Sequence, residues 1–474
     1  MKKSLIVVLS MLFVLGLTAS AFAVHAEIPA ETQSVVAKGT TQITLGGSIR
    51  FRGEAKVNTG DFLDDRADNA SAYDGRVRLS LDAQVSPNTM GRIQLESGDS
   101  DTASDYGWGA SGSENEGTYG EGHGKRGDMR ILEAWIQSKN LFGSPLGIKL
   151  GHMPYKLGEG LFANHSKYGD DLIMFFVEPT KEMHLALINV KFTEGTNTTT
   201  NGANTNNNSD DTDVYTLLGV HKIDPVNASW DISYIDDQNF STRGFHFWNI
   251  GGRVSAKIAN MVNVKADVEF QTGKAKGTQT ALTSSQVGDT AADVKVRGYA
   301  FLIGADVALG QVTLDAAIGL GSGDNNASDN KIKTFQTAQT SLQKFTYVYD
   351  YRARTAGVNA PSTGASALGA TDTGIANTTY YKIGASAKPT KDLSAGLDLY
   401  LLRATKAVST GSTYKDKDIG VEVDGRMKYN IDKNLVYFIE GGYLWAGDFY
   451  KNITANAVNP DNAYAVRHGI ELTF

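Results

Sequence analysis

The 474-residue sequence contains no cysteine and only 9 prolines. The absence of cysteine excludes disulfide bonds, thiolate catalysis, covalent haem attachment and cysteine-ligated zinc. The net charge of −7 is too mild to indicate binding to nucleic acid. After the first residues, no apolar stretch approaches the ~20 residues that a membrane-spanning helix needs. What the chain has in quantity is glycine, tyrosine and phenylalanine, with 51, 20 and 19 residues.

The N-terminal residues indicate export. Lys2 and Lys3 precede an apolar run at 5–17, and two possible cleavage sites end at Ala23 and Ala26. This pattern predicts a signal peptide over residues 1–26. The alternative is a membrane anchor, for which the run is short. An exported chain without cysteine and rich in glycine and tyrosine fits a bacterial outer-membrane barrel better than a disulfide-stabilised secreted domain.

Apolar and polar residues alternate strictly in many stretches of the chain. In the first of them Ile43, Leu45, Ile49 and Phe51 lie at odd positions, between polar residues at even positions. The same alternation recurs at 76–85, 248–258, 262–271, 418–429 and 463–474. Alternation predicts β-strands whose two faces meet different surroundings. A β-sandwich would alternate too, but these strands reach the ~9–11 residues that a tilted membrane strand needs.

The links between the strands alternate in length. Short links lie at 86–88, 142–145, 178–180, 224–226, 259–260, 310, 389–391 and 431–433. Long polar links lie at 59–72, 99–127, 154–170, 194–212, 238–244, 273–292, 321–378, 405–416 and 447–462. This rhythm predicts an all-β fold, a transmembrane antiparallel barrel of about 18 strands with short periplasmic turns and long extracellular loops. We expect the barrel at 41–474, after a periplasmic extension at 27–40, in the outer membrane of a Gram-negative cell. The least clear strand signals are 171–177 and 345–352.

Catalytic motifs are missing from the sequence. It contains no G-x-S-x-G elbow, no H-E-x-x-H pair and no glycine-rich phosphate loop before a helix. The acidic stretch 321–330 lacks the ligand spacing of an EF-hand and has the composition of a turn. We therefore expect no catalytic residue, no cofactor and no bound metal.

Charged residues on the polar side of the strands are the candidate functional residues. They comprise Arg50, Arg52, Glu54, Arg76, Arg78, Arg253, Lys265, Glu422, Asp424, Arg426, Lys428, Arg467 and Glu471. Arginine forks that face water in a pore suit carboxylate or phosphate groups, and rings of charge set selectivity. The alternative is a solvated wall whose ion pairs brace the barrel. Because the first and last strands must pair to close the barrel, Arg50, Arg52, Arg467 and Glu471 should lie close together.

Three stretches resemble the alginate export family of outer-membrane barrels. They are "LEAWIQSKNLFGSPLGIKLGHMPYKLGEG" at 132–160, "GLGSGDNNASDNKIKTF" at 319–335 and "DIGVEVDGRMKYNIDKNLVYFIEGGYLWAGDF" at 418–449. The resemblance implies a monomeric barrel that passes an anionic polysaccharide outwards through a pore lined by arginine and lysine.

These observations predict a passive outer-membrane channel. Small polar or anionic solutes, or an anionic polysaccharide, would cross a water-filled lumen narrowed by an inward-folded loop, either 99–127 or part of 321–378. Two alternatives remain: a barrel that sheathes a partner such as a multihaem cytochrome, and a surface receptor or adhesin. Other expected partners are outer-membrane lipid and the barrel assembly machinery, which would recognise the C-terminal strand ending in Phe474.

Overall fold

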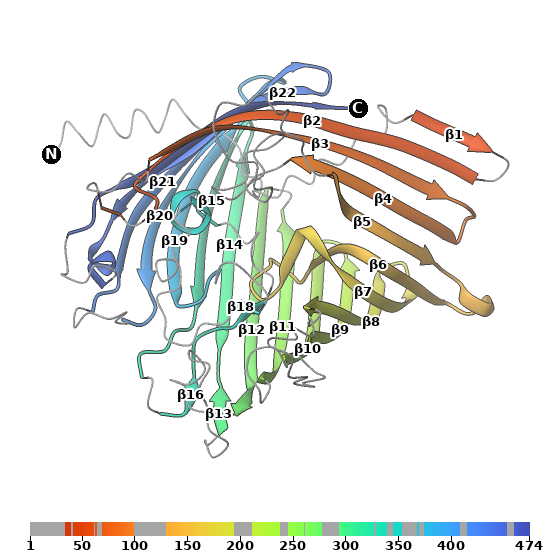
Figure 1. The fold of residues 1–474 in the computed structure, drawn as a ribbon, viewed down its shortest axis with the longest axis horizontal. Helices are drawn as coiled ribbons and strands as arrows, with labels where there is room; N and C mark the ends of the chain where they lie inside the picture. The colour runs from red at the N-terminus through yellow and green to blue at the C-terminus, as the bar shows by residue number, and fades with distance from the viewer. Residues whose placement is uncertain are drawn as a thin grey trace, which may run out of the picture.

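The computed structural model describes residues 34–38, 41–60, 62–63, 69–98, 129–193, 211–237, 245–259, 261–276, 293–326, 329–338, 345–352, 367–368, 374–407, 415–452 and 459–474. The fold is all-β, a closed antiparallel barrel of 18 strands, which confirms the predicted fold class (Figure 1). The predicted signal peptide, residues 1–26, lies outside the described residues, as does the candidate loop 99–127.

The barrel wall follows the order of the sequence. Its strands are β2 (Thr41–Val57), β3 (Ala70–Gln84), β4 (Thr89–Gly98), β5 (Met129–Ser138), β6 (Leu146–Lys156), β7 (Asn164–Thr180), β8 (Met183–Thr193), β9 (Thr212–Ile223), β10 (Val226–Asp237), β11 (Phe245–Ile258), β12 (Val262–Lys276), β14 (Tyr299–Leu309), β15 (Val312–Gly321), β19 (Thr378–Ala387), β20 (Leu393–Ala404), β21 (Asp418–Asp432), β22 (Leu435–Ala446) and β23 (Ala463–Thr473). Each pairs antiparallel with its neighbours in sequence, as hairpin connections require.

Several short elements lie between or beside the wall strands. They are β1 (Ser34–Lys38), β13 (Asp293–Val296), β16 (Lys331–Ile332), β17 (Thr337–Ala338), β18 (Ala367–Leu368), the 3₁₀-helices η3 (Leu141–Gly143) and η6 (Asp448–Asn452), and the π-helix η5 (Val348–Arg352). Within the expected extension 27–40, strand β1 pairs with the beginning of β2. Residues 348–352, where a strand signal was unclear, form the π-helix η5.

The first and last wall strands close the barrel. Strand β2 pairs with β23 from Ser48 opposite Thr473 to Val57 opposite Tyr464. The C-terminus therefore lies beside β2 (Figure 1). This confirms the prediction that the first and last strands pair to close the barrel.

Short turns gather at one end of the barrel and long connections at the other. Only two residues separate β9 from β10, and two separate β14 from β15. Gly310 in the second of these turns has a φ of 72°, a conformation that glycine adopts without strain. The link predicted at 154–170 is shorter in the structure, since β6 extends to Lys156 and β7 begins at Asn164.

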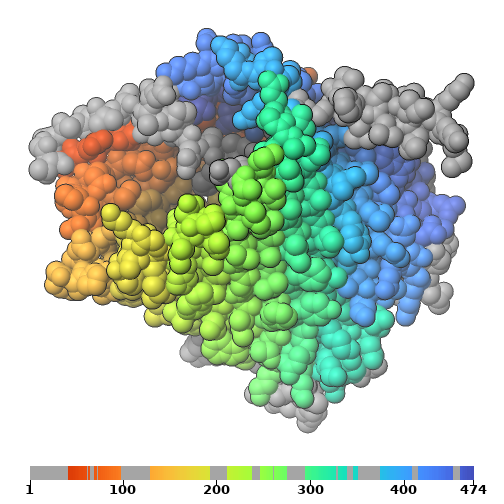
Figure 2. Space-filling model, turned by 180° about the vertical axis from the view of Figure 1, so that it is seen from behind, coloured from red at the N-terminus to blue at the C-terminus, as the bar shows by residue number. Residues whose placement is uncertain are grey.

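The outer face of the wall is apolar. In β2, Leu45, Ile49 and Phe51 are exposed, whereas the intervening Arg50 and Arg52 are buried. Figure 2 shows the wall from outside, where neighbouring strands form a continuous surface. An apolar outer band around a polar interior is typical of membrane-spanning barrels.

Among the described residues, no helix has the length and apolar character needed to cross a membrane.

Two segments of the long connections fold into the barrel. Residues 157–163, between β6 and β7, are called the arm; residues 345–350, between β15 and β19, are called the strap. Leu157, Leu161 and Phe162 of the arm and Tyr347 and Tyr349 of the strap are at most 2% exposed. The hydrophobic core of this protein therefore lies inside the barrel and includes residues of the arm and the strap.

Candidate functional site: the charged interior of the barrel

Arginines and carboxylates pair across the closing strands. The Arg52 Nε donates to Asp74 Oδ2 over 2.5 Å, and Arg50 Nη2 lies 3.7 Å from Asp74 Oδ1. Arg76 Nη2 on β3 donates to Glu471 Oε1 on β23 over 2.6 Å. In the register of β2 and β23, Arg50 lies opposite Glu471. Arg50 and Glu471 therefore lie on facing positions of the two strands, as predicted, and the ion pairs of this region also involve Asp74 and Arg76.

Other predicted charges on and beside the closing strands also have partners of opposite charge. Glu54 lies opposite Arg467 in the β2–β23 register, and Arg467 binds Glu440 on β22. Arg78 Nε donates to Glu96 Oε2 over 2.6 Å. These contacts brace neighbouring strands, which is what the alternative interpretation of the charges describes.

Strands β3 to β6 carry a further group around Arg92, a residue that the sequence analysis did not single out. Arg92 lies between Asp82 and Glu133, with N–O distances of 3.2 and 3.3 Å. The Trp135 Nε1 donates to Glu133 Oε2 over 2.9 Å, and Lys149 Nζ lies 3.8 Å from the centre of the Trp135 ring. The signal that could have identified them is the same alternation that located the other charges.

One arginine is surrounded by three carboxylates. Arg253 on β11 binds Asp231 on β10 and both Asp267 and Glu269 on β12, with 3.1 Å between Arg253 Nε and Asp267 Oδ1. All three carboxylates are fully buried. Asn249 Nδ2 also donates to Glu269 over 2.7 Å. A buried charge in the interior requires such partners, because desolvation without them costs several kcal/mol.

A comparable group lies on β15 to β21. Lys382 Nζ lies 2.7 Å from Asp315 Oδ2 and 3.2 Å from Asp398 Oδ1. Arg426 binds the other oxygen of Asp398. Two cations and two anions therefore balance one another across four strands.

The arm rests on the Arg253 group. The main-chain N–H of Glu159 donates to Asp267 Oδ2 over 2.8 Å, and Lys265 Nζ donates to Glu159 Oε2 over 2.6 Å. Gly158 has a φ of 53°, and a Cβ added there would overlap the side chain of Arg253. The Phe162 ring packs edge-on against Phe247, with 6.3 Å between ring centres. The arm thus reaches from β6 and β7 to the wall at β11 and β12.

The connection between β15 and β19 joins the arm inside the barrel. The N–H of Ala338 donates to the carbonyl of Phe162 over 2.7 Å. Gln271 of β12 exchanges two hydrogen bonds with the main chain of Gln336, at 2.8 and 2.7 Å. Nearby, the hydrogen bond that Lys333 Nζ donates to Asp329 holds the pKa of Lys333 above its usual value. The described parts of 321–378 thus include inward-folded residues, as the sequence analysis expected of this loop.

The strap is bound by two of the predicted charges. The N–H groups of Val348 and Tyr349 donate to the two oxygens of Glu422, the second over 2.9 Å, and the N–H of Tyr347 donates to Asp424 Oδ2 over 2.9 Å. Burial raises the pKa of the Tyr349 phenol, whose oxygen lies 2.7 Å from Thr378 Oγ1. Glu422 and Asp424 therefore hold main-chain amides and are not exposed to a lumen.

Exposure of the predicted residues varies along the barrel axis. Arg50, Arg52, Arg76, Arg253, Glu422 and Asp424 are buried, Glu54, Arg78, Arg426, Arg467 and Glu471 are half-buried, and Lys265 and Lys428 are exposed. On β21, exposure rises from Glu422 towards Lys428, that is, towards the short-turn end. Along this strand the interior is filled near the long connections and open near the short turns.

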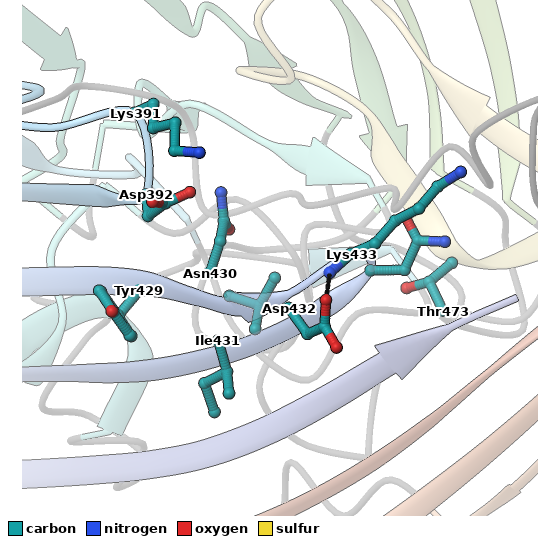
Figure 3. A pocket seen from close by; sticks show the side chains of 10 residues that line it. Lys391, Asp392, Tyr429, Asn430, Ile431, Asp432, Lys433 and Thr473 are labelled. Carbon is teal, nitrogen blue, oxygen red and sulfur yellow. Dashed lines mark hydrogen bonds between the residues drawn. The ribbon is translucent and has the colours of Figure 1, made fainter.

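A depression of about 600 Å³ lies at the short-turn end, between the turns that precede β20 and β22 (Figure 3). Lys391, Asp392, Asp432 and Lys433 are among its lining residues. The N–H of Asn430 on β21 donates to the carbonyl of Asp392, in the turn before β20, over 2.8 Å. The depression belongs to the rim of the barrel and touches neither the arm nor the strap.

Within the described ranges, no three histidine or acidic side chains are grouped in a way that could hold a metal ion.

No protein-family model matches this sequence, and no curated protein matches it. Among solved structures, Acinetobacter baumannii OccAB1 is similar with a TM-score of 0.53 and 12% identity, over 91% of this chain and 96% of that chain. Pseudomonas aeruginosa OccK8 (OprE) has a TM-score of 0.53 at 10% identity, over 91% and 98%. Pseudomonas aeruginosa OccK9 (OpdG) has a TM-score of 0.52 at 11% identity, over 91% and 98%. These neighbours are outer-membrane β-barrel porins. At such identities the likeness establishes a porin-like fold, and the resemblance to the alginate export family stays a prediction.

Proposed function

We propose that this protein is an outer-membrane channel, porin-like and without enzymatic activity, through which small polar solutes pass passively. The observation that carries the proposal is an interior lined by charged side chains and narrowed by the arm and the strap. A wall with an apolar outside and a charged inside suits a water-filled path through a membrane. The fold shared with outer-membrane porins supports it.

The ion pairs of the wall bear on the solute. Arg52 binds Asp74, Arg76 binds Glu471 and Arg426 binds Asp398. A polyanion would have to compete with these carboxylates for the guanidinium groups. We therefore propose small polar solutes, anions included, as the cargo in preference to an anionic polysaccharide, and we expect weak charge selectivity.

The arrangement of the ends follows from this proposal. The short turns, the start of β2 and the end of β23 would face the periplasm, and the long connections would face the outside. The C-terminal strand ending in Phe474 would be the part that the assembly machinery recognises. A sheath around a partner such as a cytochrome is less well supported, because the arm and the strap take up interior space that a partner would need.

Swelling of liposomes that contain the purified protein tests the proposal. We expect swelling in small sugars and small organic anions, with rates that fall as solute size increases. Liposomes that do not swell in any small solute, although the barrel is folded, would contradict a passive channel. Swelling that occurs only with an oligouronate would restore the polysaccharide assignment.

A further inference from the structure

We propose that the strap, residues 345–350, is a gate on the long-loop side of the channel and that Glu422 and Asp424 hold it closed. This inference rests on the proposed function, since a gate regulates passage only through a channel. It concerns how passage would be controlled and assigns a role to two carboxylates that do not reach a solute path.

Two side chains of the wall bind the main chain of the strap, beside the side-chain contacts of Tyr349 with Thr378 and of Phe345 with Tyr380. Glu422 and Asp424 point from β21 to the same side and together accept three consecutive main-chain N–H groups. Tyr347, Val348 and Tyr349 are at most 1% exposed, and a buried N–H group is costly to leave without an acceptor. No strand of the wall pairs with the strap in the ladder of main-chain hydrogen bonds that joins β21 to β22. Loss of the two carboxylate contacts would thus remove these three hydrogen bonds together.

The strap keeps its own shape through internal hydrogen bonds. The N–H of Phe345 donates to Asp350 Oδ2 and the N–H of Asp350 donates to Thr346 Oγ1, both over 2.9 Å. These bonds close a small ring that does not involve the wall. These bonds favour movement of the strap as one body, as a hinged element requires.

The contact of the strap with the wall depends on Gly442, which leaves room for it. A Cβ added to Gly442 on β22 would overlap a carboxylate oxygen of Asp424 and lie 3.0 Å from Val348 Cγ2 and 3.1 Å from Tyr347 Cβ. The guanidinium of Arg467 on β23 lies 5.6 Å from the centre of the Tyr347 ring. The wall surface that contacts the strap thus spans β21 to β23. A single methyl group at Gly442 would displace the strap from this surface.

Cysteine labelling tests the gate directly, because the natural sequence has no cysteine. Val348 is fully buried, so a single Val348→Cys substitution places a thiol beneath the closed strap. The probe is a membrane-impermeant maleimide, applied to the whole protein in liposomes. We expect slow labelling, and labelling about tenfold faster when Gly442→Ala is added, which corresponds to about 1.4 kcal/mol less stability of the closed position.

Matched variants separate the gate from general damage. Gly425→Ala lies on the same hairpin, and its nearest neighbour would be Leu397 Cδ1 at 3.9 Å, so it should leave the labelling rate unchanged. Glu422→Gln with Asp424→Asn replaces one oxygen of each side chain by an amide donor without adding bulk, and should also accelerate labelling. Tyr349→Phe removes only the hydroxyl contact with Thr378. This variant replaces either of the other two as the test of strap movement if one of them does not fold.

Labelling and conductance together distinguish the two proposals. Fast labelling in Gly442→Ala, or in Glu422→Gln with Asp424→Asn, supports the gate if the channel openings of that variant are also longer or larger. Labelling that stays slow in every folded variant overturns the gate, whatever the conductance. Fast labelling without conductance in any variant overturns the channel and leaves the movement of the strap established.

Discussion

The main chains of Gly47 and Phe474 exchange two hydrogen bonds. The N–H of Gly47 donates to the carbonyl of Phe474 over 2.7 Å, and the N–H of Phe474 donates to the carbonyl of Gly47 over 2.9 Å. The last residue of the chain thus completes the ladder between β2 and β23. Closure leaves no unpaired edge between the first and last strands, which is the condition that a hydrocarbon environment imposes.

Gly47→Ala should weaken the closure. A Cβ at this position would lie 2.6 Å from the carbonyl of Arg78 and 2.8 Å from the Phe474 ring. We expect a loss of about 1–3 kcal/mol in the free energy of unfolding, typical of overpacking. Urea unfolding in lipid vesicles measures it. Gly252→Ala, whose Cβ would meet only Val268 at 3.7 Å, is the control, and equal losses in both variants would refute this account of the closure.

Gly158→Ala should displace the arm. Both Gly158 and Gly310 have positive φ, so alanine costs about 1–3 kcal/mol of backbone strain at either position. Only at Gly158 would the added methyl also overlap Arg253, whereas Gly310 has no neighbour within 4 Å. We expect a larger single-channel conductance for Gly158→Ala and no change for Gly310→Ala. Unchanged conductance in a folded Gly158→Ala barrel would show that the arm does not narrow the path.

Arg253→Met should destabilise the barrel strongly. The substitution leaves Asp231, Asp267 and Glu269 buried without their shared cation, and breaking a buried ion pair on one side costs about 3–5 kcal/mol. Adding Asp231→Asn, Asp267→Asn and Glu269→Gln should recover part of this loss. Thermal unfolding compares the variants. If Arg253→Met alone were as stable as the natural protein, the ion pairs of Arg253 would contribute little to the stability of the barrel.

Lys428→Gln should change the charge selectivity of the channel, whereas Arg52→Gln should change the stability of the barrel. Lys428 is exposed on β21, so we expect its loss to move the reversal potential towards cations with little effect on stability. Arg52 is 2% exposed and bound to Asp74, so its loss should destabilise the barrel. Reversal potentials under a salt gradient and urea unfolding provide the two measurements. A reversal potential unchanged by Lys428→Gln would remove this lysine from the solute path.

Much of the fold follows from the sequence, because a membrane barrel presents each strand with two unlike surroundings. Alternation in β2, β12 and β21 therefore predicts strands, and the alternating length of the links predicts hairpins and closure. The pairing of charges does not follow from alternation. Whether Arg76 meets Glu471 or another acid depends on the register of β2, β3 and β23, and register is set by contacts distant in sequence.

The arm was missed for a related reason. Its glycines and its position between two strands indicate an ordinary external link. The available signal was the presence of Leu157, Leu161 and Phe162 in that link, since apolar residues in a connection have to be buried against something. The roles of Glu422 and Asp424 could not be predicted, because their partners are main-chain amides of the strap, more than 70 residues away in sequence.

Single-channel recording in planar lipid bilayers tests the central claim most directly. Purified protein should produce discrete conductance steps in potassium chloride, with weak charge selectivity and with larger steps for Gly158→Ala than for Gly310→Ala. A folded barrel that inserts into the bilayer and gives no steps, in the natural sequence and in Gly158→Ala alike, would contradict the account of this protein as a channel.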